Sequence, residues 1–178
     1  MSAWYSYINM KRGFTLIELL VVVTIIGILS TIVTASLSSA RNKARYSRAL
    51  GEFRSISNAL ELYYIDNGEY PPDVYRDIPP GLGTYLAGED VSAWPQGPWN
   101  GSMYDWDYWE DIDYVGQKIY QISIRFCPLN GVLADCTFPD DAWAEDFDVK
   151  SSLYYCVDGA CRAHFDEDLS YPGLCVNC

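Results

Sequence analysis

The stretch Gly13-Phe14-Thr15-Leu16-Ile17-Glu18-Leu19-Leu20-Val21-Val22-Val23 follows a Lys-Arg pair and continues as an apolar run to residue 35. The run contains no proline, and Glu18 is its only ionisable residue. A helix over 14–35 would be about 33 Å long at about 1.5 Å per residue, enough to cross a hydrocarbon core of about 30 Å. The basic pair predicts that this end stays cytoplasmic and that the chain after the run is exported.

Glu18 is the unusual residue of this run. A carboxylate within a membrane span is unfavourable unless it is paired, so Glu18 is a candidate functional residue, although a position near the helix start would also let it reach the interface. An ordinary secretory signal is the alternative to an anchor, and Ser38-Ser39-Ala40 offers small residues for its cleavage. The run is longer than the roughly 7–15 apolar residues of such signals and contains an acid, which favours an anchor.

The segment from Lys11 to Val23 resembles the class III signal of type IV pilins and type II secretion pseudopilins. In that family the prepilin peptidase cuts after the glycine. The new N-terminal amine, usually methylated, pairs with a glutamate near the start of a neighbouring subunit. The resemblance implies cleavage between Gly13 and Phe14, methylation of the Phe14 amine and an assembly role for Glu18 as the partner of that amine. Translation could start at Met1 or at Met10, and the mature protein would be the same.

The helical pattern continues beyond the apolar run. Apolar residues recur at three- and four-residue steps and predict one stripe on an otherwise polar helix. Asp66-Asn67-Gly68, with two prolines soon after, predicts the helix end. The stripe consists of Tyr46, Leu50, Phe53, Ile56, Leu60 and Tyr63 or Tyr64.

Residues after the helix show the patterns of a small β domain. Segments 103–109 and 120–126 alternate polar and apolar side chains, which predicts strands with one buried face. Segments 152–157 and 160–165 flank Asp158-Gly159, which predicts a two-residue hairpin turn. Residues 127–149 are expected to be a loop. The sheet should be antiparallel, with three or four strands, and lie on the apolar stripe of the helix.

These patterns and the resemblance together predict an α+β pilin fold. The long helix would pack on a small antiparallel sheet that forms the head. The expected divisions are a leader at 1–13, a membrane or filament-core half of the helix at 14–35, an amphipathic half at 36–67 and a globular head at 68–178 with a disulfide-rich C-terminal region.

Six cysteines lie in the last third of the chain and would be exported, so disulfides are expected. Zinc is the alternative at Cys175-x-x-Cys178, which lacks a well-placed second ligand pair. Six cysteines allow 15 pairings. Across the predicted hairpin Cys156 would face Cys161 as a non-hydrogen-bonded pair. The other expected pairs are Cys127–Cys136 and Cys175–Cys178.

The charge of the chain is uneven. The formal net charge is −12, whereas residues 66–178 hold 21 Asp and Glu against five Lys and Arg, and residues 41–54 are basic. An acidic head disfavours binding of nucleic acid through that surface. Acidic side chains could hold calcium, although their spacing fits no complete loop motif. The calcium candidates are Asp140, Asp141, Asp146 and Asp148, or Asp166 and Asp168.

Little in the sequence indicates catalysis, and no cofactor is expected. Four aspartates could form paired carboxylates, but the solvated face of a strand and its turn is the favoured interpretation; they are Asp105, Asp107, Asp111 and Asp113. The expected function is that of a structural subunit of a type IV pilus or pseudopilus. A minor or tip subunit with an adhesive role is the alternative, and a membrane-anchored secreted enzyme is a more remote one.

The resemblance also implies partners and a location. Further copies of the chain, the prepilin peptidase and an inner-membrane assembly platform would be its partners. The precursor would cross the inner membrane once, with its head outside the cytoplasm. The mature chain would then leave the membrane for a periplasmic or extracellular filament.

Overall fold

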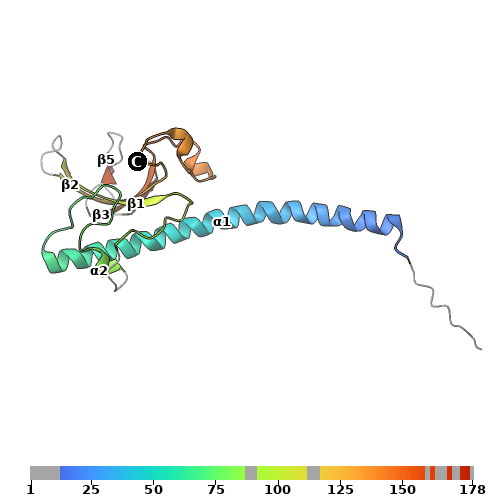
Figure 1. The fold of residues 1–178 in the computed structure, drawn as a ribbon, viewed down its shortest axis with the longest axis horizontal. Coiled ribbons are helices and arrows are strands. Elements are labelled where there is room, and N and C mark those ends of the chain that lie inside the picture. Colours follow the sequence, from blue (N-terminus) through green and yellow to red (C-terminus); the bar gives the residue numbers. More distant parts are fainter. Residues whose placement is uncertain are drawn as a thin grey trace, which may run out of the picture. The chain divides into compact units, whose positions relative to one another are not determined.

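The structure is a computed structural model that describes residues 13–86, 92–111, 117–158, 161–162, 168–169 and 173–176. The chain forms two units, with the boundary between Arg41 and Asn42 inside helix α1 (Leu16–Asn67). The other elements are α2 (Gly83–Leu86), β1 (Met103–Asp111), β2 (Gln117–Arg125), η1 (Leu133–Asp135), η2 (Ala142–Ala144), β3 (Ser152–Asp158), β4 (Cys161–Arg162), β5 (Asp168–Leu169) and β6 (Gly173–Val176) (Figure 1).

In the first unit, the described residues are the start of α1 and the three residues before it. The large apolar side chains from Phe14 to Leu37 are all at least 46% exposed. Within the described part of the chain, α1 is long and apolar enough to cross a membrane. Because exposed apolar surface is unfavourable in water, this segment needs lipid or protein around it.

The second unit contains a four-stranded antiparallel sheet in the order β1-β2-β3-β6 and a two-stranded pair, β4-β5. Strands β1 and β2 pair along their whole length, with Tyr104 opposite Ile124 and Trp106 opposite Ile122. The predicted antiparallel sheet and α+β architecture are thus confirmed.

One face of this sheet packs on the second half of α1 (Figure 1). Phe53 is fully buried. Its ring centroid lies 5.9 Å from the ring centroid of Tyr104 and 5.6 Å from that of Tyr155. Polar contacts support the same packing, since the Tyr104 hydroxyl donates to Glu52, which also pairs with Arg48 at 2.8 Å. The fully buried residues of the helix stripe are Ala49, Phe53, Ile56, Ala59 and Leu60.

The predicted stripe therefore differs from the buried one in detail. Ala49 and Ala59 are buried, while Leu50 is only half-buried and Tyr64 is 44% exposed. Small side chains can fill a close-packed helix–sheet interface, and a pattern that counts only large apolar residues misses such positions.

Helix α1 ends where the sequence predicts. Gly68 has a φ of +78°, the left-handed conformation that glycine adopts without strain. The Gly68 amide donates to the Tyr64 carbonyl at 2.7 Å, and the Asn67 side chain donates to the Tyr63 carbonyl at 2.8 Å. These bonds satisfy carbonyls that the ending helix leaves free.

The predicted hairpin across Asp158-Gly159 is wrong. Strand β3 already has neighbours along both edges, because Cys156 lies opposite Gln121 on β2 and opposite Gly173 on β6. Strand β4 pairs with β5 instead, with Cys161 opposite Leu169. A strand with two occupied edges has no backbone groups left for a third partner.

Candidate functional site

The start of α1 holds the residues of the predicted processing and assembly site. Thr15 directly precedes the helix, and its amide and hydroxyl donate to Glu18 Oε2 at 2.9 and 2.8 Å. The Glu18 amide donates in return to the Thr15 hydroxyl at 3.3 Å. This reciprocal pattern is a capping box, which satisfies amides that the first turn leaves without partners.

The capping box fixes where the carboxylate lies relative to the predicted cleavage junction. Gly13 and Phe14 precede Thr15, and the Phe14 side chain is 82% exposed. Among the described residues nothing donates to the second oxygen of Glu18, so this oxygen can accept a bond from a cation outside the chain. A negative charge at a helix N-terminus is also favourable.

Thr15 is a site residue that the sequence interpretation overlooked. The pattern Thr-x-x-Glu before an apolar run is itself the signature of a capping box, so the signal was present in the sequence. Glu18 therefore has a role within its own chain as well as the predicted role toward a neighbour.

The candidate carboxylates of β1 form a buried ion cluster. Asp105 and Asp107 lie on the sheet face opposite α1, and Arg125 Nε lies 3.1 Å from Asp105 while Arg125 Nη2 lies 3.0 Å from Asp107. Gln121 and Ser123 also donate to Asp107, at 3.1 and 3.4 Å. Their expected placement on a solvated face is wrong, because Asp105 is 1% and Asp107 7% exposed.

This ion cluster is hydrogen-bonded to the loop that follows α1. Arg76 has a φ of +55°, and its amide donates to Asp105 at 2.7 Å. The Arg76 guanidinium also donates to the Cys127 carbonyl. With both carboxylates engaged by an arginine and neutral donors, the cluster has the character of a structural ion network. Of the other two candidate carboxylates, Asp111 ends β1 and Asp113 lies outside the described residues.

The stability of the head should depend on pH through Asp105. Burial, then the charge of Asp107, raises the pKa of Asp105 from 3.8 to about 6, against the opposing effect of Arg125. The folded chain thus holds this proton at pH values where the unfolded chain has lost it. The contribution of this group to stability is greatest below about pH 4 and is lost as the pH rises through about 6.

Asp105→Asn cannot ionise, so it should flatten the profile of melting temperature against pH between about 4 and 6. Asp146→Asn is the matched control, because Asp146 is exposed and its profile should follow that of the unchanged chain. Burial also raises the pKa of Asp73, so a residual slope of the same sign should remain. Parallel profiles for Asp105→Asn and the unchanged chain would contradict the assignment.

The expected calcium ligands do not gather among the residues that the structure describes. Asp141 caps η2 by accepting from the Ala142 amide at 3.0 Å, and Asp148 accepts from the Lys150 amide at 2.8 Å. Across those residues no three acidic, histidine or cysteine side chains are placed to share a metal. Asp166 lies outside them, and the structure describes only the backbone of Asp168.

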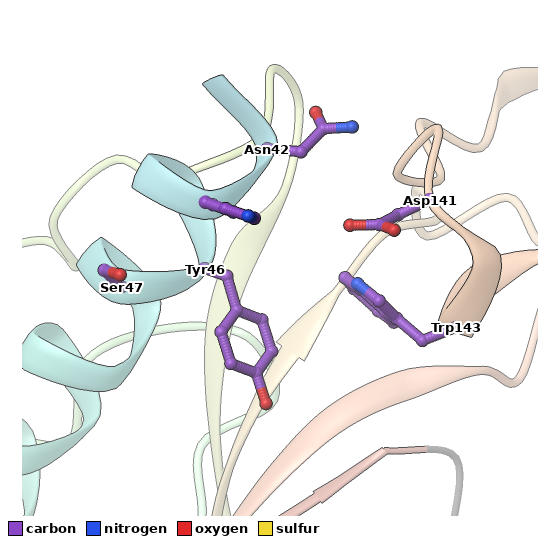
Figure 2. A pocket seen from close by; sticks show the side chains of 6 residues that line it. Asn42, Tyr46, Ser47, Asp141 and Trp143 are labelled. Atoms are coloured by element: carbon purple, nitrogen blue, oxygen red, sulfur yellow. The ribbon is translucent and has the colours of Figure 1, made fainter. Parts of the chain in front are cut away.

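A pocket opens between the first turns of α1 in the head and the loop that contains η2 (Figure 2). Tyr46 from the helix and Trp143 from the loop extend into the same space, with ring centroids 6.1 Å apart. Lys43 and Asp141 add charges to its lining, and its volume is about 430 Å³. Asn42 donates to the Asp140 carbonyl at 2.7 Å and so fixes the loop beside the helix.

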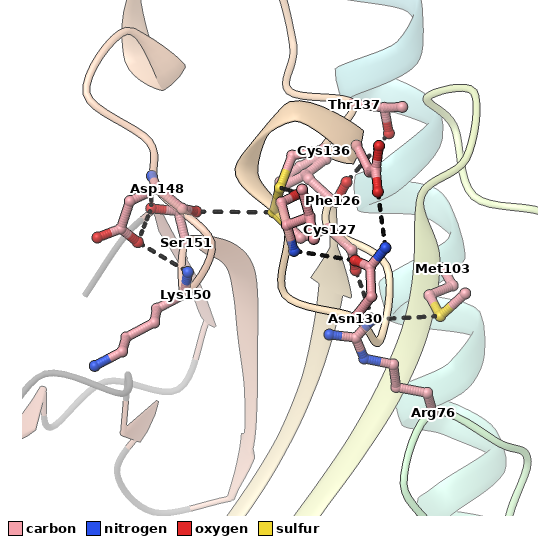
Figure 3. The surroundings of a disulfide bond; sticks show 12 residues. Arg76, Met103, Phe126, Cys127, Asn130, Cys136, Thr137, Asp148, Lys150 and Ser151 are labelled. Atoms are coloured by element: carbon pink, nitrogen blue, oxygen red, sulfur yellow. Dashed lines mark hydrogen bonds between the residues drawn. A yellow bond between two sulfur atoms is a disulfide. The ribbon is translucent and has the colours of Figure 1, made fainter.

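The predicted pairing of Cys127 with Cys136 is present as a disulfide that closes a loop after β2 (Figure 3). The Thr137 amide donates to the Phe126 carbonyl at 2.8 Å, which ties the two ends of the loop together. Inside it, Asn130 donates to Asp135 at 2.7 Å and accepts from the Val132 amide at 3.0 Å. The loop is therefore held in one conformation by covalent and polar contacts.

The other two predicted disulfides involve cysteines whose side chains lie partly outside the described residues. Cys156 is buried and disulfide-bonded, but its partner is not among the residues whose side chains the structure describes. Cys161 and Cys175 lie on β4 and β6, where only the backbone is described, and Cys178 lies outside the described residues. The pairs Cys156–Cys161 and Cys175–Cys178 remain predictions, but the hairpin register from which Cys156–Cys161 was inferred is not the observed one, since Cys156 lies opposite Gln121 and Gly173.

Comparison with known proteins gives one consistent result. The family described as the prokaryotic N-terminal methylation motif matches residues 8–34. The type II secretion system core protein G of Klebsiella michiganensis is 31% identical over 99 residues, which are 51% of this chain and 70% of the relative. The protein of the same name is 35% identical over 97 residues in Aeromonas hydrophila (50% of this chain, 68% of the relative) and 32% identical over 97 residues in Escherichia coli K12 (50% and 67%). No solved structure matches.

Proposed function

Because this chain belongs to the family of the type II secretion system core protein G, the major pseudopilin, we propose that it is the repeating subunit of a pseudopilus-like filament. It is a structural subunit, as its family is one of structural proteins and not of enzymes. The observation that best supports a subunit that polymerises is the start of α1, where Glu18 lies just after the predicted Gly13-Phe14 junction and one of its oxygens accepts no hydrogen bond from a described residue.

The precursor is anchored in a membrane by its apolar helix, is processed by the prepilin peptidase and belongs to a filament built of subunits. In the proposal the head lies outside the cytoplasm and an inner-membrane platform extracts the mature chain. The amine of each incoming Phe14 then pairs with Glu18 of a copy already in place. The mature chain ends in a periplasmic or extracellular filament of identical subunits.

Removal of the apolar helix from lipid requires a replacement environment for its side chains. Residues from Phe14 to Leu37 expose their apolar side chains in the single chain. Equivalent segments of neighbouring copies would cover this surface in a filament, so the free energy lost on leaving lipid is regained by helix packing. The same segment thus serves the precursor as an anchor and the filament as its core.

N-terminal analysis of assembled protein tests this function. Filament protein should begin at Phe14 with a methylated amine, and Gly13→Trp should accumulate uncut precursor because the bulky side chain lies at the junction. Mass spectrometry of sheared filaments and of membranes makes both measurements. A mature chain that begins at Met10 or Arg41, or a methylated chain that never leaves the membrane, would contradict the proposal.

Calcium binding stays a proposal for the acidic loops of the head. Carboxylate oxygens suit this hard cation, and a bound ion would bring exposed aspartates of residues 140–148 together. In that case added calcium should raise the melting temperature of the head and a chelator should lower it. A melting temperature that neither addition changes would contradict calcium binding.

The acidic charge of the head also argues against nucleic acid as a partner of this surface.

A further inference from the structure

The loop closed by Cys127–Cys136 exposes an apolar surface that the fold does not use. Leu129 is 63%, Val132 47% and Leu133 57% exposed. Single exposed apolar side chains are ordinary, whereas here three lie within one covalently closed loop, and grouped exposed apolar side chains mark surfaces that contact a partner. The patch formed by Leu129, Val132 and Leu133 is called here the loop patch.

The loop patch is prepared for binding because its backbone is already ordered. The disulfide and the bonds of Asn130 to Asp135 and Val132 hold the loop without help from a partner (Figure 3). Ordering a flexible loop on association costs free energy, and a loop held in advance avoids most of that cost.

The pocket lined by Tyr46 and Trp143 is suited to receive apolar side chains such as those of the loop patch. Aromatic side chains form much of its wall, and its volume of about 430 Å³ is within the range of about 300–1,000 Å³ common for ligand pockets. The loop patch and the pocket have no residue in common. A loop patch on one copy can therefore enter the pocket of a second copy while its own pocket remains available.

We propose that the loop patch of one subunit docks into the Tyr46–Trp143 pocket of the next subunit along the filament. This inference rests on the proposed function and specifies the contact between heads. Two different surfaces that fit each other make a heterologous contact, and repetition of such a contact generates an open helical assembly. A contact between identical surfaces would instead stop at a dimer.

Charge complementarity supports a second copy as the occupant. Lys43 and Asp141 lie in the pocket lining and are exposed, as is Asp135 at the end of the loop patch, so the pocket offers one cation to Asp135. Docking brings this cation and this anion from different copies together at the rim of an apolar contact, where such pairs direct orientation.

Cysteine cross-linking of the full chain in cells, without unmodified subunit, tests the contact. Ser47 lines the pocket, so Ser47→Cys combined with Leu133→Cys should give a ladder of covalent multimers on oxidation of filaments. Each single substitution should give at most dimers. Ser55→Cys with Leu133→Cys is the matched control, because Ser55 is exposed on α1 outside the pocket lining, and it should give no ladder.

Assembly assays of charged variants provide the second measurement. Leu133→Asp should reduce filament yield about tenfold or more, since it places a charge in an apolar contact, while processing at Gly13 and the melting temperature of the head stay unchanged. Ile65→Asp is the control, because Ile65 is 71% exposed and outside both surfaces. Lys43→Glu should reduce assembly, and combining it with Asp135→Lys should recover part of the loss, although Asp135→Lys also removes the bond from Asn130.

The outcomes separate this contact from the proposed function. Filaments without the ladder, or normal filaments from Leu133→Asp, overturn the contact alone. A normally expressed chain that is processed but forms no filament overturns the proposed function and this inference with it. A ladder limited to Ser47→Cys with Leu133→Cys, together with rescue by the charge exchange, supports the contact.

Discussion

Glu18→Ala should enter the membrane and be processed normally yet fail to assemble into filaments. The substitution removes the carboxylate that the proposed function assigns to the Phe14 amine of the incoming subunit, and it removes an unfavourable acid from the apolar segment. A close charge pair across an interface commonly changes affinity by a factor of about ten or more. Filament yield in cells without unmodified subunit should fall by at least about that factor, measured by shearing and immunoblotting.

Two further variants separate the pairing from the capping box. Glu18→Gln keeps the acceptor for the Thr15 amide and hydroxyl but has no charge, so it should assemble as poorly as the alanine variant. Thr15→Ala keeps the charge and loses the hydroxyl, so it should assemble better than either. Normal assembly of Glu18→Gln would mean that the residue acts only as a helix cap.

Arg125→Met should destabilise the head by about 3–5 kcal/mol, the usual effect of removing one partner from a buried ion pair. Asp105 and Asp107 would then face each other as buried carboxylates without their cation. Domains of this kind are stable by only about 5–15 kcal/mol, so a large share of the stability would be lost. Chemical denaturation of a soluble head fragment, residues 42–178, at neutral pH makes the measurement.

The controls for Arg125→Met are designed around the two carboxylates. Arg125→Lys keeps a charge but not the forked geometry and should cost less than the methionine variant. Adding Asp105→Asn and Asp107→Asn to Arg125→Met removes the unpaired charges and should recover much of the stability. The loss in Arg125→Met should also shrink as the pH falls and Asp105 becomes protonated. An equal loss in the single and triple variants would show that Arg125 acts by packing alone.

Structural features that depend on residues close together in the chain could be predicted from the sequence. The apolar run, the Asp-Asn-Gly helix end and the Cys127–Cys136 loop depend on residues close together in the chain, and the structure contains all three. The capping box at Thr15 and Glu18 is equally local and could have been inferred from its spacing. For these features the local free energies of helix, turn and short loop are decisive.

Features that depend on distant segments were decided by the tertiary structure. Alternation along β1 identifies a polar face. That face is buried only because Arg125 and the loop of Arg76 pack against its two aspartates, Asp105 and Asp107. In the same way the predicted pairing of β3 with the segment after Asp158-Gly159 is replaced by pairing with β2 and β6, which occupy both edges of β3. The sequence by itself thus determined the long apolar segment and the helix on which the head packs, and it predicts the processing junction. The edge partners of β3 and the burial of the charged face were settled by long-range contacts, because hydrogen-bonding edges and solvent exposure depend on which segments meet in space.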